Sequence, residues 1–156
     1  MYRKILVAYN GTSESRSALQ ECIRLAPDPS AEIHLLAVIN LPPSVVIGEY
    51  AMVSMIGIEE EILAEKKKME HELSAGAAYL REAGLQVQTH IEIGEPVPTI
   101  ADLVDTLGIE LVIVGHSRHQ SLAMRWWRGA TDALLVEKIR CSLLVATDPK
   151  KDENIT

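Results

Sequence analysis

The sequence predicts an α/β fold, in which a single open five-stranded parallel sheet carries helices on both faces. Short apolar runs rich in branched residues, typical of strands buried on both faces, alternate with longer segments of helical periodicity. Intervening helices of ten or more residues supply the right-handed crossovers that a parallel sheet requires. The length of 156 residues, with 47% apolar and 24% charged residues, suits one globular domain.

The first two strands and the first helix are expected in residues 5–39. Residues 5–9 form a continuous apolar run, and residues 13–26 follow with apolar positions three and four apart. Thr12 or Ser13 is the expected N-cap of this helix, because a side-chain oxygen can accept from a free backbone N–H there. Residues 32–39 repeat the pattern of a buried strand.

A long helix follows and ends before Gly84. One face of it is marked by Ile58, Ile62, Met69, Leu73, Ala77 and Leu80. The connection before it, Leu41 to Gly57, has seventeen residues and one charge, Glu49. Because a loop of this length and apolar content is unusual, we expect residues 45–56 to be ordered and to cover a cleft or a partner subunit.

The third strand, residues 86–93, alternates polar and apolar side chains, which is typical of an edge strand with one wet face. Pro96 and Pro98 fit the first turn of the next helix, which ends at Leu107 before Gly108. The pattern therefore predicts a third strand–helix unit.

The remaining elements complete five repeats. Residues 109–114 form a buried strand that ends on Gly115, residues 129–139 a helix, and residues 142–146 the last strand. The polar tail, residues 148–156, is expected to be disordered.

Composition excludes several classes of function. With 15 basic and 22 acidic residues the net charge is −7, so neither nucleic acid nor an anionic membrane surface is an expected partner. No apolar stretch approaches about 18 residues without a charge or proline, so no membrane span is expected. The two cysteines, Cys22 and Cys141, are too few and too far apart in sequence for a disulfide scaffold, and we assign them no functional role. This low cysteine content is typical of a protein of the reducing cytoplasm.

Ligands of such sheets bind beyond the carboxyl ends of the strands, so functional residues are expected just after Tyr9, Val38 and Val114. Residues 10–13 place an amide and two hydroxyls at one such end. They suit a polar ligand, or they serve only as turn and helix cap.

Residues 115–131 form a basic segment that contains Arg118, Arg125 and Arg128 and no acid. Guanidinium groups and backbone N–H groups exposed at glycines suit phosphate or sulfate. The alternative is that these arginines pair with the surplus acids of the chain.

Ser117 has two histidine neighbours, His116 and His119, but it lacks a GxSxG elbow and a carboxylate within this segment. Hydrolase chemistry is therefore remote. The histidines lack further ligands at metal spacing, so no metal site is expected.

The chain resembles the universal stress protein family of the bacterial stress-protein A type. The resemblance covers residues 1–147 and includes Lys4-Ile5-Leu6-Val7-Ala8, Gly94-Glu95-Pro96, Gly115-His116-Ser117 and Cys141-Ser142-Leu143-Leu144-Val145. It implies the strand order 3-2-1-4-5 of the adenine-nucleotide alpha-hydrolase-like fold and a cytoplasmic location. It also implies a homodimer through the last strand, at Leu143, Leu144 and Val145.

Many members of this family bind ATP through a loop of the form G-x2-G-x9-G-[S/T]. Here Gly115 matches the first glycine, Arg118 replaces the second, and Gly129 fits the third after a connection one residue longer. Ala130 replaces the hydroxyl residue, and Thr131 follows it. A side chain at Arg118 blocks the close approach of phosphate to backbone that glycine allows.

Asn10 stands where the family usually has an Asp that contacts the nucleotide. The resemblance implies a stress-response homodimer that acts through unidentified partners, and these departures predict that it binds ATP weakly or not at all. The alternative is an ATP- or AMP-binding regulatory module or a slow ATPase. The residues that would contact a nucleotide are Ala8, Tyr9, Asn10, Val38, Val114, Gly115, Ser117, Arg118, Gly129, Ala130 and Thr131.

Overall fold

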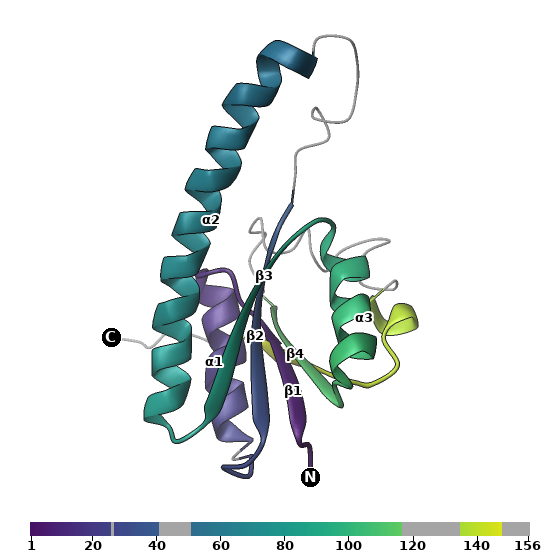
Figure 1. Cartoon of the computed structure of the whole chain (residues 1–156). Helices are drawn as coiled ribbons and strands as arrows, with labels where there is room; N and C mark the ends of the chain where they lie inside the picture. The colour runs from purple at the N-terminus through teal and green to yellow at the C-terminus, as the bar shows by residue number, and fades with distance from the viewer. Residues whose placement is uncertain (26, 41–50, 117–134, 148–156) are drawn as a thin grey trace, which may run out of the picture.

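Strands and helices alternate along the chain in the computed structural model (Figure 1), which describes residues 1–25, 27–40, 51–116 and 135–147, with residues 51–56 as helical backbone only. The strands are β1 (Lys4–Ala8), β2 (Glu32–Ile39), β3 (Gln86–Ile93), β4 (Leu111–His116) and β5 (Ser142–Thr147). The helices are α1 (Ser13–Arg24), α2 (Ala51–Glu82) and α3 (Pro96–Leu107). A helical turn at residues 135–138 precedes β5.

The strands form one parallel sheet in the order β3-β2-β1-β4-β5. Its centre is β1, where Val7 lies opposite Leu35 of β2 and Ile113 of β4. The predicted strand order is confirmed, as is the prediction that residues 86–93 form an edge strand. The other edge is β5.

Each face of the sheet carries its own apolar core, since successive side chains of a strand point to opposite faces. Ile5 and Val7 pack in the core beneath α1 and α2, whereas Leu6 and Ala8 pack beneath α3 and residues 135–139. Figure 1 shows α1 and α2 on one side of the sheet and α3 on the other. Burial on both faces explains why the central strands are apolar without alternation.

Local signals set the ends of α1 and α3. Thr12 is the N-cap of α1, and its Oγ1 accepts from the backbone N–H of Ser15 at 3.3 Å. Pro96 opens α3, where its missing N–H costs no hydrogen bond. Gly108 ends α3 in the left-handed conformation at φ 68°, which glycine adopts without strain.

Several boundaries differ from the sequence prediction, which places β1 at 5–9, α1 at 13–26, β4 at 109–114 and β5 at 142–146. Two of the differences have a clear physical reason. Helix α2 begins at Ala51, so residues 51–57, predicted as part of the connection, are helical. Gly57 favours a break in the sequence pattern, but one glycine costs a helix only about 1 kcal/mol relative to alanine. Strand β4 continues through Gly115 to His116, because Gly115 and His116 still pair with Ala146 and Thr147 of β5.

Four predictions fall outside the described residues. They are the order and contacts of the connection over residues 41–50, the anion-binding role of residues 117–131, the first part of the predicted helix at 129–134, and the disorder of the tail at 148–156. Among the helices that the structure describes, none has the length and apolar content needed to cross a bilayer.

Candidate functional site

The connections after β1 and β4 leave toward opposite faces of the sheet. The chain leaves β1 to form α1 on one face, whereas after β4 it returns through residues 135–139 on the other face. Adjacent parallel strands whose connections diverge in this way leave a crevice at their carboxyl ends, where ligands of open α/β sheets bind. The candidate site is therefore the carboxyl edge of β1 and β4.

Three predicted site residues lie on the same face of the sheet at this edge. Ala8, Val38 and Val114 all belong to the α3-side core and are at most 6% exposed. They come from β1, β2 and β4, so the structure brings them together as an apolar wall. Their backbone lies at the edge, while their side chains are buried in the core.

Tyr9 lies differently from these three residues. Its side chain packs in the opposite core, beneath α2, because side-chain direction alternates along the strand. A Cβ added at Gly76 of α2 would lie 2.9 Å from Tyr9 Cε1, so the helix rests directly on the ring. Only the backbone of Tyr9 lies at the carboxyl edge, where its N–H donates to the carbonyl oxygen of Leu36 at 2.8 Å.

The turn after β1 uses its polar side chains locally. Asn10 Oδ1 accepts from the backbone N–H of Thr12 at 3.1 Å and from Thr12 Oγ1 at 2.7 Å. Ser15 Oγ accepts from the backbone N–H of Asn10 at 3.3 Å and donates to the Thr12 carbonyl at 2.9 Å. The geometry thus favours the turn-and-cap interpretation of residues 10–13 over a ligand set.

Gly115 allows the first turn of α1 and the end of β4 to lie close together at the site. A Cβ at this position would collide with the backbone carbonyl oxygen of Glu14 and lie 3.0 Å from the backbone nitrogen of Ser15. The first turn of α1 therefore packs directly on β4. This contact requires glycine whether or not a phosphate binds.

Helix α2 also reaches the turn after β1, a contact that the sequence analysis missed. A Cβ at Gly11 would lie 2.7 Å from Glu72 Cδ, so the Glu72 side chain covers the face of this glycine. Gly11 has φ +82°, in the region that favours glycine. The sequence carries one weak signal that α2 packs closely here: Gly76 lies inside a helical pattern, where a glycine often marks a close contact.

The predicted phosphate loop is not placed by the structure. Ser117, Arg118, Gly129, Ala130 and Thr131 lie outside the described residues, as do the other arginines of the basic segment. His116, the last described residue before this segment, is half-buried at the end of β4.

The cysteines offer little chemistry. Burial raises the pKa of the Cys22 thiol to about 12, so it stays neutral and packs as a small apolar group. Burial also raises the pKa of Cys141. In the part of the chain that the structure describes, no three His, Cys, Asp or Glu side chains are grouped to hold a metal ion.

Known proteins resemble this chain over nearly its whole length. The model of the universal stress protein family matches residues 1–147. The chain is 25% identical to universal stress protein MJ0531 of Methanocaldococcus jannaschii, covering 97% of this chain and 86% of that protein. It is also 25% identical to universal stress protein YxiE of Bacillus subtilis, covering 93% and 99% of the two chains.

Solved structures share the fold at lower identity. The hypothetical protein MJ0577 superposes with a TM-score of 0.76 at 18% identity, covering 97% of this chain and 99% of that one. An Arabidopsis thaliana family protein with AMP bound gives a TM-score of 0.65 at 17% identity, covering 97% and 95% of the chains. A universal stress protein in complex with cAMP gives 0.59 at 16% identity, covering 94% and 97%. By its sequence match and its fold, this chain belongs to the universal stress protein family.

Proposed function

We propose that this chain is a non-catalytic, cytoplasmic stress-response protein that acts as a homodimer through partner proteins and binds ATP weakly or not at all. The observation that carries the homodimer is the open edge at β5. Val145 is 45% exposed there, and Leu143 and Leu144 are only half-buried. The strand contains no lysine or proline, the residues that commonly protect an open edge.

A second copy of this chain is the proposed cover for the edge. Two β5 strands pairing antiparallel across a two-fold axis satisfy the free backbone groups of both edges and bury the same apolar side chains twice. The interface then involves Leu143, Leu144 and Val145 of each protomer.

A matched pair of variants tests the dimer. Val145→Lys places a charge inside the proposed interface, so it is expected to sediment as a monomer. Ile93→Lys is the control, since Ile93 is 47% exposed on the opposite edge strand and is expected to remain a dimer when changed. A folded V145K protein that sediments as a dimer would contradict the proposal.

Two local observations support weak ATP binding. The side-chain oxygen of Asn10 already accepts hydrogen bonds within the turn, and Gly115 is required by the packing of α1. The presence of these two residues is therefore explained without a bound nucleotide. Arg118 adds a side chain where the family loop has glycine. Phosphate or sulfate suits the basic segment from Gly115 to Thr131 better, because a small anion needs less close backbone approach.

A second candidate function is an AMP- or cAMP-responsive module or a slow ATPase. Two structural relatives were solved with AMP or cAMP. The apolar wall of Ala8, Val38 and Val114 lies at the carboxyl edge of the sheet, where ligands of open α/β sheets bind. The basic segment would then supply contacts to the phosphate.

Calorimetry with ATP, AMP and cAMP separates the two candidates. Under the first, ATP binds no more tightly than about 1 mM, and the double variant Arg118→Gly with Ala130→Ser increases its affinity. Low-micromolar binding of any of these nucleotides to the unmodified chain would favour the second. Hydrolysis of ATP, followed as phosphate release, would identify the slow ATPase.

A further inference from the structure

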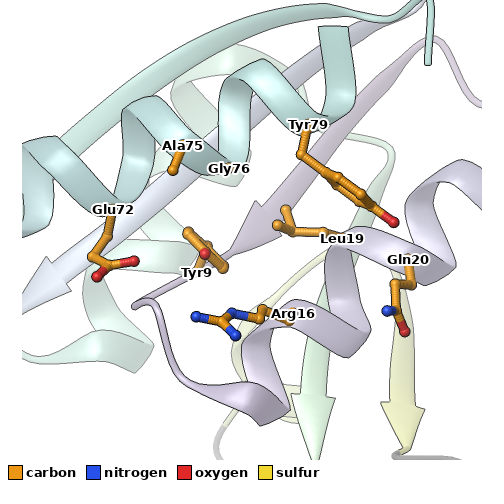
Figure 2. A pocket seen from close by; sticks show the side chains of 8 residues that line it. All are labelled: Tyr9, Arg16, Leu19, Gln20, Glu72, Ala75, Gly76 and Tyr79. Atoms are coloured by element: carbon orange, nitrogen blue, oxygen red, sulfur yellow. The ribbon is translucent and has the colours of Figure 1, made fainter. Parts of the chain in front are cut away.

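A pocket of about 300 Å³ lies between α1 and α2, on the face of the sheet opposite α3. This volume is at the lower end of the range for small-molecule sites. Figure 2 shows side chains from α1 and α2 around it, together with Tyr9, which directly follows β1. The pocket shares no residue with the apolar wall of Ala8, Val38 and Val114. Tyr9, which lines the pocket, directly follows Ala8 in the chain.

The base of the pocket is apolar and fixed. Tyr9 and Leu19 are only 4% and 3% exposed, and the Tyr9 ring is held beneath Gly76. Tyr79 of α2, 44% exposed, forms a wall at one end. A ligand with a flat apolar body can therefore bury that body on Tyr9 and Leu19, beside a second aromatic ring.

Opposite charges lie at the other end. Arg16 comes from α1 and Glu72 from α2, and Figure 2 shows the Arg16 guanidinium pointing toward the end where Glu72 lies. Among the described residues, no ion pair joins these two side chains. The two side chains therefore do not neutralise each other, and the pocket presents one charge of each sign.

Glu72 is positioned by its neighbours. Its carboxylate covers Gly11, where a Cβ would lie 2.8 Å from Glu72 Oε2, and the side chain is half-buried. A carboxylate restrained in this way loses less freedom when it accepts a hydrogen bond from a ligand. The guanidinium of Arg16 offers a planar set of donors that matches a carboxylate.

We propose that this pocket binds a small zwitterion with an apolar body, of the class of aromatic α-amino acids. The ligand's carboxylate pairs with Arg16 and its ammonium group with Glu72. Its ring lies on Tyr9 and Leu19, and extends toward Tyr79. Neither a simple anion nor a simple cation satisfies both charges of the pocket.

Titration with L-phenylalanine, followed by NMR chemical shifts, tests the proposal. The expected dissociation constant is about 1 mM, typical of a ligand of this size. The analogues 3-phenylpropionate and phenethylamine each lack one charge and are expected to bind at least about tenfold more weakly. Equal binding of either analogue would overturn the zwitterion assignment, and so would a lack of shifts at about 10 mM L-phenylalanine.

Variants locate the site. Arg16→Gln and Glu72→Gln are each expected to weaken binding at least about tenfold. Arg24→Gln is the control, because this exposed arginine on the same helix pairs with Glu21 and is outside the pocket. Ala75→Leu fills the pocket from an exposed position and is expected to abolish binding without loss of fold. Unchanged binding by R16Q, E72Q and A75L would overturn the assignment of the pocket.

Discussion

At the residue scale, the absence of a side chain at Gly115 lets α1 lie directly on β4. The opposing atoms are the backbone of Glu14 and Ser15, which cannot rotate away as a flexible side chain can. Any Cβ here must push the start of α1 off the sheet. The same contact sets the distance between the turn after β1 and the end of β4, which together form the candidate site.

We therefore expect Gly115→Ala to lower the free energy of unfolding by about 3 kcal/mol or more, as overpacking against fixed backbone does. Denaturant unfolding followed by circular dichroism measures the change. A G115A protein as stable as the unmodified chain would show that the start of α1 moves without cost.

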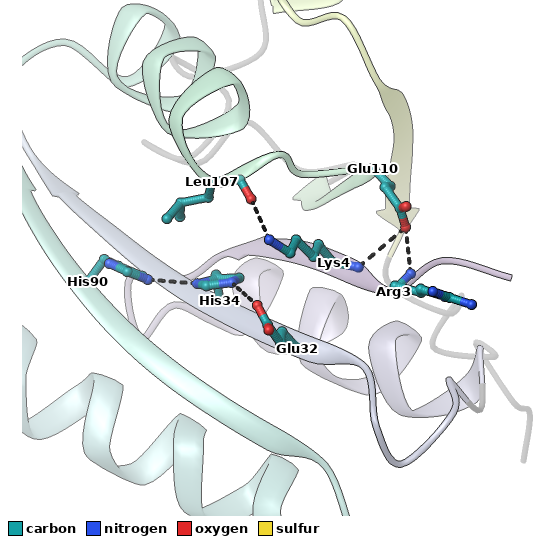
Figure 3. Close-up of polar contacts among 7 residues, drawn as sticks. All are labelled: Arg3, Lys4, Glu32, His34, His90, Leu107 and Glu110. Carbon is teal, nitrogen blue, oxygen red and sulfur yellow. Dashed lines mark hydrogen bonds and ion pairs between the residues drawn. The ribbon is translucent and has the colours of Figure 1, made fainter.

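Buried His34 and half-buried His90 form a polar contact on the α3 side of the sheet (Figure 3). His34 is 2% exposed, and its Nδ1 lies 2.9 Å from His90 Nε2, so one proton can bridge the two nitrogens. His34 Nε2 lies 3.5 Å from Glu32 Oε2, without the geometry of a hydrogen bond. Burial, and next the neighbouring His34, lower the pKa of His90 below its usual value, while Glu92 opposes the shift.

This lowered pKa makes stability depend on pH. The unfolded chain binds a proton at His90 more readily than the folded chain does, so the free energy of unfolding rises with pH through this region. The contribution of neutral His90 to the free energy of unfolding is fully present above the usual histidine pKa of about 6.5. It is lost as the pH falls from there through the lowered pKa of His90 in the folded chain. His90→Gln is expected to flatten this slope in urea titrations between about pH 7.5 and 5.5; an unchanged slope would assign it to other groups.

At the element scale, α2 is much longer than the strands it covers. Its 32 residues span about 48 Å, whereas a strand of eight residues spans about 26 Å. From Gly57 onward, where the structure describes the side chains, the buried apolar residues of α2 begin at Met69, so residues 57–68 depend more on their own helix propensity than on packing. Figure 1 shows this end extending beyond the carboxyl edge of the sheet.

Gly57 lies in that unsupported part, and a Cβ there would meet no atom within 4 Å. Gly57→Ala is therefore expected to increase the free energy of unfolding by about 0.5–1 kcal/mol, because alanine loses less backbone entropy in a helix. Far-ultraviolet circular dichroism would also show a gain in helix if this end frays. A loss of stability would mean that the residue is not helical in solution.

The strands could be predicted well because each burial state produces a local signal: a continuous apolar run in a strand buried on both faces, and alternation in an edge strand with one wet face. Residues 32–39 and 86–93 were predicted with the bounds that β2 and β3 have. The start of α2 was missed because Gly57 resembles a break, although helix continues on both sides of it. Within the site, Ala8, Val38 and Val114 could be placed from strand order, whereas the contact of Glu72 with Gly11 depends on how α2 packs, which no local pattern specifies.

At the scale of the whole molecule, the two edges of the sheet differ in how they are protected. At β3, Glu92 and the exposed glutamines Gln86 and Gln88 make the edge strand polar. At β5, the residues between Ser142 and Thr147 are all apolar. An asymmetry of this kind favours the proposed association at β5 alone, because a two-fold dimer formed there closes on itself and does not propagate into a filament.

If the proposed dimer is the folded unit, its stability depends on protein concentration. Dissociation accompanies unfolding, so mass action shifts the equilibrium toward the folded dimer as concentration rises. With the usual unfolding entropy per residue, a tenfold increase in concentration is expected to raise Tm by about 2 °C. Scanning calorimetry over a hundredfold range measures this shift, and V145K, as a folded monomer, should show none. A constant Tm for the unmodified chain would mean that unfolding and dissociation are not coupled, and the β5 edge would then need a different cover.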